Sequence, residues 1–165
     1  AFALGIGIIH QHFKLVDVFT ATENIILGMP GKLNLAEARK KVREICDRYG
    51  FDIDPDQKIY DMSVSQKQTV EIVKALYRGA DILILDEPTA ALDPIAEAEI
   101  YEQFSQMISG KTAVYISHRM SSCKFCDRIV VLDHGRIAED GTHDTLLANH
   151  GIYANLYETQ AQYYT

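Results

Sequence analysis

The sequence lacks a long apolar segment, an excess of basic residues and a cysteine-rich pattern, and each absence excludes a class of protein. No apolar run among its 165 residues approaches the roughly 20 that span a bilayer as a helix, and the start carries no basic, apolar signal sequence. The formal net charge of −7 argues against nucleic acid as a partner, because phosphate binding needs a basic face. Three cysteines, one unpaired by count, indicate a reducing cytoplasm rather than a disulfide framework. We therefore expect any membrane role to come through a partner or through a segment outside these residues.

The composition that remains is that of an ordinary globular domain. Apolar residues make up 47% of the chain and charged residues 24%, and 165 residues suffice for one domain with a buried core. The residue patterns predict strands over residues 2–9, 82–85, 112–117, 128–132 and 136–138, and helices over residues 35–49, 63–79, 93–110, 119–126 and 144–164. Such alternation with apolar strands predicts a mostly parallel sheet that is covered on both faces.

Local signals define several of these boundaries. Asn34 and Ser63 each precede a predicted helix, and each is followed three residues later by Glu or Gln, which completes a capping box. His134-Gly135 predicts a tight hairpin turn between the last two strands. The helices between residues 34 and 79 stand apart from the strand–helix rhythm. We expect them to form an inserted helical subdomain.

An acidic pair follows the apolar strand over residues 82–85. Open α/β sheets bind ligands at the carboxyl ends of their strands, which is where Asp86 and Glu87 are expected to emerge. Asp86 is a candidate ligand for Mg²⁺, which prefers carboxylate and water oxygens. Glu87 is a candidate general base for an attacking water. The alternative is a strand that ends in two solvated acids.

A second candidate site lies at the start of the helix over residues 63–79. Ser63, Val64, Ser65 and Gln66 begin this helix, where free N–H groups and the positive end of the helix dipole suit a γ-phosphate. The alternative is an ordinary cap, because Ser-x-x-Gln begins many helices. On these residues alone both interpretations stay open.

Taken in order along the chain, these motifs resemble those of ATP-binding cassette (ABC) ATPases. Residues 62–66 are similar to the LSGGQ signature, and residues 82–89 are similar to the acidic strand that follows it in the family. Gln11 resembles the Q-loop glutamine, Asp93 the end of the D-loop, and His118 the switch histidine that contacts the γ-phosphate. The resemblance covers nearly the whole chain. It implies a P-loop NTPase-like α/β fold, in which a mostly parallel sheet carries an inserted helical subdomain.

The resemblance also implies an activity, cofactors and partners. Members of the family hydrolyse ATP with Mg²⁺ in head-to-tail pairs of ATPase domains, docked on a transmembrane permease domain at the cytoplasmic face of a membrane. We therefore expect a second ATPase domain and a permease domain as partners, and no nucleic acid. The expected catalytic residues are Glu87, His118 and Gln11, the expected metal ligands are Asp86 and Gln11, and the expected nucleotide-binding residues are Ser63, Val64, Ser65, Gln66 and Asp93.

One central motif of the family is absent from these residues. No GxxxxGK[ST] loop occurs, and Gly31-Lys32-Leu33 lacks the earlier glycine and the hydroxyl residue that such a loop needs. In the family this loop grips the nucleotide phosphates. We therefore expect an ATPase domain that is truncated on its N-terminal side and inactive alone. Its expected parts are a Q-loop and helical subdomain over residues 20–80, core strands over 81–140 and C-terminal helices over 141–165.

The two halves of the chain resemble different branches of the family. Residues 9–16, 22–25 and 70–81 are similar to the ATPases of simple-sugar and nucleoside importers. Residues 116–119, 126–128, 135–136 and 140–144 are similar to exporter-type ATPases. The junction lies near Asp93. A natural recombinant and an assembled sequence would both show such a junction.

Two rival functions and two weaker sites complete the interpretation. A non-transport ABC protein that acts on nucleic acid would carry basic arms or coiled-coil insertions, and neither occurs here. A non-enzymatic fragment that only binds a partner ATPase would fail a nucleotide-binding titration. His10 and His12 lack a third ligand for a metal. Cys123 and Cys126 have redox-like spacing, yet we interpret them as packing residues.

Overall fold

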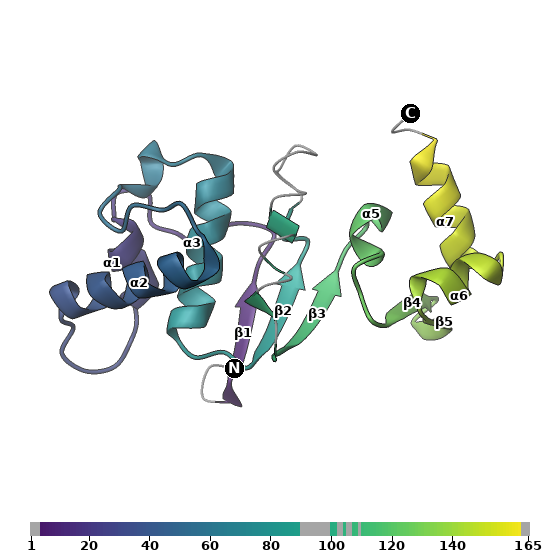
Figure 1. The fold of residues 1–165 in the computed structure, drawn as a ribbon, viewed down its shortest axis with the longest axis horizontal. Helices are drawn as coiled ribbons and strands as arrows, with labels where there is room; N and C mark the ends of the chain where they lie inside the picture. Colours follow the sequence, from purple (N-terminus) through teal and green to yellow (C-terminus); the bar gives the residue numbers. More distant parts are fainter. Residues whose placement is uncertain (1–3, 90–99, 102–103, 105–106, 109, 163–165) are drawn as a thin grey trace. The chain divides into compact units, whose positions relative to one another are not determined.

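The fold is seen in a computed structural model (Figure 1), which describes residues 4–89, 100–101, 104, 107–108 and 110–162. The chain divides into two compact units, Ala1–Ile116 and Ser117–Thr165. Each unit has a hydrophobic core of its own. Among the described residues, no helix has the length and apolar character needed to cross a membrane.

The sheet of the first unit is parallel, as predicted, and its strands are adjacent in the order β1 (Ile6–Ile9), β2 (Ile82–Asp86) and β3 (Thr112–Ile116). The pairing sets Ile9 beside Leu85 in the first pair of strands. It sets Asp86 beside Ile116 in the second. The carboxyl ends of all three strands therefore lie at one edge of the sheet.

The first strand is shorter than the pattern over residues 2–9 predicts, because it begins only at Ile6. Gly5 has a left-handed φ of +69°, and its carbonyl accepts the N–H groups of Asp81 (2.8 Å) and Ile82 (3.0 Å). This turn precedes the ladder between β1 and β2, so the strand does not include Leu4 or Gly5, and residues 2 and 3 of the prediction lie outside the described residues.

One face of this sheet is buried and the other is exposed. The buried face packs on helix α3 (Val64–Tyr77) so closely that a Cβ on Gly7 would lie 3.2 Å from the Cβ of Ala75. The opposite face carries apolar side chains that stay partly exposed: Ile8 (37%), Ile82 (36%), Val114 (48%) and Ile116 (47%). The prediction of a sheet covered on both faces was therefore wrong within the described residues, because the helices of this unit pack against the first face.

Two of the helices between β1 and β2 follow from their predicted caps. In α2 (Leu35–Tyr49), the Asn34 side chain accepts the N–H groups of Ala36 and Glu37, so it forms an ordinary N-cap rather than the complete capping box that was predicted. Gly50 ends the helix with a φ of +70°. In α3, the side chain of Ser63 accepts the N–H of Gln66 while the Gln66 side chain accepts the N–H of Ser63, which is a complete capping box. Both predicted helices are confirmed.

The structure adds a short helix that the sequence pattern did not predict. Helix α1 (Ala21–Ile26) begins with a capping box between Thr20 and Glu23. Its six residues are too few to show a helical period, so its position depends on burial rather than on propensity. A 3₁₀ turn, η2 (Ile59–Asp61), then leads into α3.

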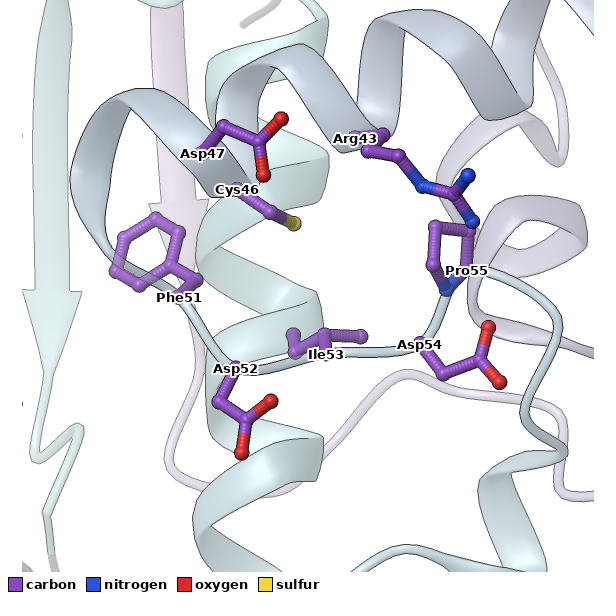
Figure 2. A pocket seen from close by; sticks show the side chains of 8 residues that line it. All are labelled: Arg43, Cys46, Asp47, Phe51, Asp52, Ile53, Asp54 and Pro55. Carbon is purple, nitrogen blue, oxygen red and sulfur yellow. The ribbon is translucent and has the colours of Figure 1, made fainter.

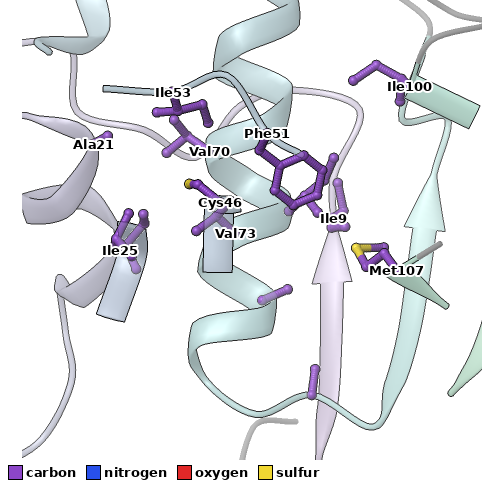
Figure 3. Close-up of a cluster of buried hydrophobic side chains, with 14 of the residues drawn as sticks. Ile9, Ala21, Ile25, Cys46, Phe51, Ile53, Val70, Val73, Ile100 and Met107 are labelled. Carbon is purple, nitrogen blue, oxygen red and sulfur yellow. The ribbon is translucent and has the colours of Figure 1, made fainter. Parts of the chain in front are cut away.

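A single hydrophobic core joins these helices to the sheet (Figure 3). Ile25 of α1, Cys46 of α2 and Val73 of α3 belong to the same buried cluster as Ile9 of β1. Met107, from the segment that precedes β3, belongs to it as well. The helices that we expected as an inserted subdomain therefore share one core with the strands.

The predicted helix over residues 93–110 lies largely outside the described residues. Of its described positions, Tyr101, Phe104 and Met107 are helical and buried. The rings of Tyr101 and Phe104 contact the ring of Tyr115 on β3, with centroids 6.3 and 5.9 Å apart. These contacts show that the segment packs on the sheet where it is described.

The second unit contains a hairpin and short helices, namely α5 (Met120–Cys123), β4 (Ile129–Asp133), β5 (Arg136–Gly141), α6 (His143–Ala148) and α7 (Ile152–Ala161). The hairpin turn is confirmed, because His134 and Gly135 both have positive φ angles, of +48° and +73°. The helix predicted over residues 119–126 is shorter, since α5 ends at Cys123. Buried Leu146 and Tyr153 belong to the core of this unit.

Candidate active site

The structure brings together two predicted site residues that are 76 positions apart. Gln11 follows β1 and Glu87 follows β2, and these neighbouring parallel strands end at the same edge. The Gln11 side-chain amide, through Nε2, donates a hydrogen bond of 2.9 Å to Oε2 of Glu87. The contact is exposed to solvent, so a ligand at this edge has access to both groups. It places an amide and a carboxylate where open α/β sheets bind their ligands.

Glu87 is held in an uncommon backbone conformation. Its φ is +45°, in the left-handed region, which costs a residue with a Cβ about 1 kcal/mol. The conformation is fixed from both sides, because the Glu87 N–H donates to the carbonyl of Ile116 (2.9 Å) and the next two residues are buried. Of these, Thr89 shares a hydrogen bond of 3.0 Å with the Tyr101 hydroxyl. Backbone strain of this kind persists where the surrounding structure imposes it, often at functional sites.

Asp86 is the last residue of β2 and is half-buried. Its register with Ile116 places it on the more exposed face of the sheet, next to Glu87 in the chain. Among the described residues, no group of three or more His, Cys, Asp or Glu side chains could hold a metal ion. Mg²⁺ does not need such a cage, because one or two carboxylates, water and substrate phosphates usually complete its shell. The oxygens of Asp86 and Gln11 therefore fit the chemistry of that ion.

The loop after β1 is pinned by two buried polar residues that our sequence analysis missed. Asn24 of α1, 1% exposed, accepts the N–H of Val16 (2.7 Å) and donates to its carbonyl (3.1 Å). Glu71 of α3, 5% exposed, accepts the N–H of Lys14 (2.7 Å). Both helices thus hold the backbone that carries Gln11. The available signal was Glu71 itself, a charge inside an apolar run on one helix.

The predicted signature segment lies at the start of α3. Here the side chains of Ser63 and Gln66 are engaged with each other's backbone in the capping box. The N–H groups of Val64 and Ser65, in the first turn, have no acceptor inside the helix. Val64 is 43% exposed. If this segment binds phosphate, the backbone of Val64 and Ser65 is the part available to do so.

The other residues considered from the sequence are His118, Asp93, His10 and His12. His118 is exposed and belongs to the second unit, where it follows β3 and precedes α5. Asp93 lies outside the described residues. His10 and His12 are exposed and, within the described part of the chain, join no metal-binding group.

The two cysteines of the second unit are packing residues, as interpreted from the sequence. Cys123 and Cys126 contact its core. Burial raises the pKa of both thiols, to about 11 for Cys126. A thiol with a raised pKa stays protonated near neutral pH and is a poor nucleophile.

A hollow of about 410 Å³ lies away from the strand edge (Figure 2), at the end of α2 and in the loop that follows. Its lining residues include Arg43, Asp47, Asp52 and Asp54 around the apolar side chains of Cys46, Phe51, Ile53 and Pro55. It contains none of the predicted site residues. The chemistry of this chain is therefore expected at the strand edge and not in this hollow.

Comparison with known proteins gives the family context. A model of the ABC transporter family matches residues 1–90. The chain is 49% identical over 139 residues to the nucleoside import ATP-binding protein NupA of Lactococcus lactis. The matched region covers 81% of this chain and 28% of that protein. The chain is also 48% identical over 99 residues to the ATP-dependent lipid A-core flippase of Cupriavidus pinatubonensis. That matched region covers 60% of this chain and 17% of the flippase. Importers and exporters are both represented, as the two-branch resemblance predicts.

A solved structure shares the fold. The structure of a bacterial Atm1-family ABC exporter with ATP bound matches with a TM-score of 0.78 at 30% identity. The match covers 96% of this chain and 29% of that chain. The chain thus spans less than a third of the length of each of these relatives.

Proposed function

This chain belongs to the ABC transporter family, and from that premise we propose that it takes part in ATP hydrolysis that drives transport across a membrane. ATP and Mg²⁺ are the cofactors of this activity. The partners are a second ATPase domain, in a head-to-tail pair, and a transmembrane permease domain at the cytoplasmic face of the membrane. The named relatives are a nucleoside import ATP-binding protein, a lipid A-core flippase and an ABC exporter, which supports transport as the purpose of the hydrolysis.

One observation carries the proposal, namely the hydrogen bond of 2.9 Å between Gln11 Nε2 and Glu87 Oε2. The bond holds a carboxylate, the group that a general base needs, at the edge of the sheet where a ligand has access. The amide also fixes the direction of the carboxylate, while the β3 carbonyl of Ile116 fixes its backbone. The base is thus oriented before a substrate arrives.

The roles of the site residues follow from this arrangement. The Glu87 carboxylate accepts a proton from the water that attacks the γ-phosphorus, and Gln11 keeps that carboxylate and water in line. Asp86 and the Gln11 amide oxygen would hold Mg²⁺, which would neutralise phosphate charge when bound. His118 contacts the γ-phosphate from the end of the next strand along the chain. The N–H groups of Val64 and Ser65, in the first turn of α3, bind the γ-phosphate of the nucleotide held by the partner domain.

The chain is inactive alone under this proposal. No GxxxxGK[ST] loop occurs in its 165 residues, so the backbone cradle and lysine for the phosphates come from elsewhere. Calorimetric titration of residues 1–165 with MgATP should therefore give no micromolar binding. Micromolar affinity would contradict this part of the proposal.

The decisive test is the variant Glu87→Gln in the full-length protein that contains this chain. The amide keeps the shape of the carboxylate and loses its basicity, so turnover should fall by about 10²-fold or more while MgATP still binds. Asp81→Asn is the matched control, because it removes the same charge at the opposite end of β2, where the side chain is 87% exposed. Near-normal turnover of Glu87→Gln would refute the assignment of the base. Undetectable ATP turnover by the unaltered full-length protein would refute the proposed function.

A further inference from the structure

The side-chain amide of Gln160 forms hydrogen bonds with the backbone on both sides of Arg119, the residue that follows His118. Gln160, on helix α7, donates from Nε2 to the carbonyl of His118 (2.6 Å) and accepts the N–H of Met120 at Oε1 (2.9 Å). Gln160 is about 40 residues from both partners in the chain, and all three residues belong to the same compact unit. A single side chain therefore satisfies a carbonyl and an N–H that flank Arg119, as a neighbouring strand would.

Two serine hydroxyls form hydrogen bonds with the backbone of Arg119 in the same segment. The hydroxyl of Ser122, which is 3% exposed, donates to the carbonyl of Arg119 (2.7 Å). The hydroxyl of Ser117 accepts the N–H of Arg119 (3.0 Å). With the two bonds from Gln160, the backbone from His118 to Met120 is tied at four groups. His118 itself is an exposed residue.

Helix α7 is itself rigidly placed, so Gln160 is not a chance surface contact. The Glu139 carboxylate on β5 accepts the first two N–H groups of α7, from Ile152 (2.9 Å) and Tyr153 (2.8 Å). Tyr153 is 1% exposed, and its hydroxyl shares a hydrogen bond of 2.7 Å with Nδ1 of His143. Seven residues separate Tyr153 from Gln160, so both lie on the same face of the helix. The face that packs into the core is the face that reaches His118.

We propose that Gln160 is the residue that positions His118, so that the C-terminal helix α7 sets the geometry of the histidine that meets the γ-phosphate. This inference rests on the proposed function, since it assigns the histidine the role given there. Gln160 does not touch the reacting atoms. It acts through the backbone of His118. The direction of the His118 imidazole depends on the backbone conformation that the two hydrogen bonds from Gln160 maintain.

The test uses Gln160→Met in the full-length protein, because methionine has a similar length and can form neither hydrogen bond. Loss of one neutral hydrogen bond should speed hydrogen exchange of the Met120 amide by about 5-fold. The turnover number for ATP should fall by about 10-fold, because small displacements of a catalytic group reduce the rate steeply, while KM for MgATP changes less than about twofold. Glu158→Gln is the matched control, since Glu158 lies exposed on the same helix and both measurements should stay unchanged.

A double-mutant cycle separates positioning from a loss of general stability. If Gln160 acts through His118, the substitution should have no further effect on turnover once His118→Ala is present. Multiplicative losses in the double variant would overturn the inference, as would unchanged exchange of the Met120 amide in Gln160→Met. These outcomes differ from failure of the proposed function. In that case the unaltered protein would show no ATP turnover, which would overturn both claims.

Discussion

The loop that carries Gln11 is held by a buried ion pair, and removal of that pair should release it. Glu71 and Lys74 are adjacent on α3, with 3.6 Å between Oε2 and Nζ. Their side chains are 5% and 16% exposed. The Glu71 carboxylate accepts the N–H of Lys14 (2.7 Å), and the Lys74 ammonium donates to the carbonyl of Lys14 (3.1 Å). The substitution Glu71→Ala therefore frees the Lys14 N–H and leaves the Lys74 ammonium without its carboxylate.

The size of the effect follows from the type of bond that is lost. A hydrogen bond to a charged acceptor contributes about 2 kcal/mol, and burial of this pair limits the screening by solvent. We therefore expect Glu71→Ala to lower the free energy of local opening at Lys14 by about 2 kcal/mol, which corresponds to about 30-fold faster amide exchange. Glu71→Gln keeps a neutral acceptor and should cost about 1 kcal/mol, or about 5-fold in exchange.

The assay is hydrogen–deuterium exchange of the full-length protein, followed in peptides that cover residues 10–16. Glu44→Gln is the control, because it removes a carboxylate from an exposed pair with Lys40, in which the side chains are 61% and 80% exposed. Exposed pairs contribute little, so this variant should leave the exchange of residues 10–16 unchanged. Equal exchange in Glu71→Ala and in the unaltered protein would refute the reasoning, because the loop would then be held by other contacts.

Three further predictions concern other parts of the chain. Gly151→Ala should free the start of α7, because the added Cβ would overlap the Glu139 carboxylate that caps it; exchange of the first α7 amides should then rise by about 10-fold, the scale of a lost cap. Ser65→Gly in the full-length protein should raise ATP turnover, because a bare backbone approaches phosphate more closely, and a slower glycine variant would show that the serine hydroxyl is a working ligand. Burial raises the pKa of Cys46 and Cys126 to about 11, so their neutral thiols should be alkylated about 100-fold more slowly than a free thiol at pH 8, with rates that rise between pH 9 and 11; fast labelling at pH 8 would contradict this.

Elements with local signals could be predicted from the order of the residues. A cap at Asn34 and a period of 3.6 define α2, and the His134-Gly135 pair defines the hairpin turn, because such signals act over a few residues. The apolar run before Asp86 predicted a strand with an acidic pair at its carboxyl end. These features depend on backbone preferences and on the apolar pattern within one short segment. Both can be read from the order of the residues.

Contacts between distant groups depend on how the strands and helices pack. The order β1-β2-β3 brings Gln11 to Glu87 across 76 positions, and no local signal encodes strand order. Helix packing likewise assigns Glu71 to the loop after β1 and Gln160 to the backbone of His118, although each residue looks like any polar side chain on a helix. Contacts of this kind depend on the summed burial of many apolar side chains, which settles where whole elements lie, and the polar partners are chosen only once those elements are in place.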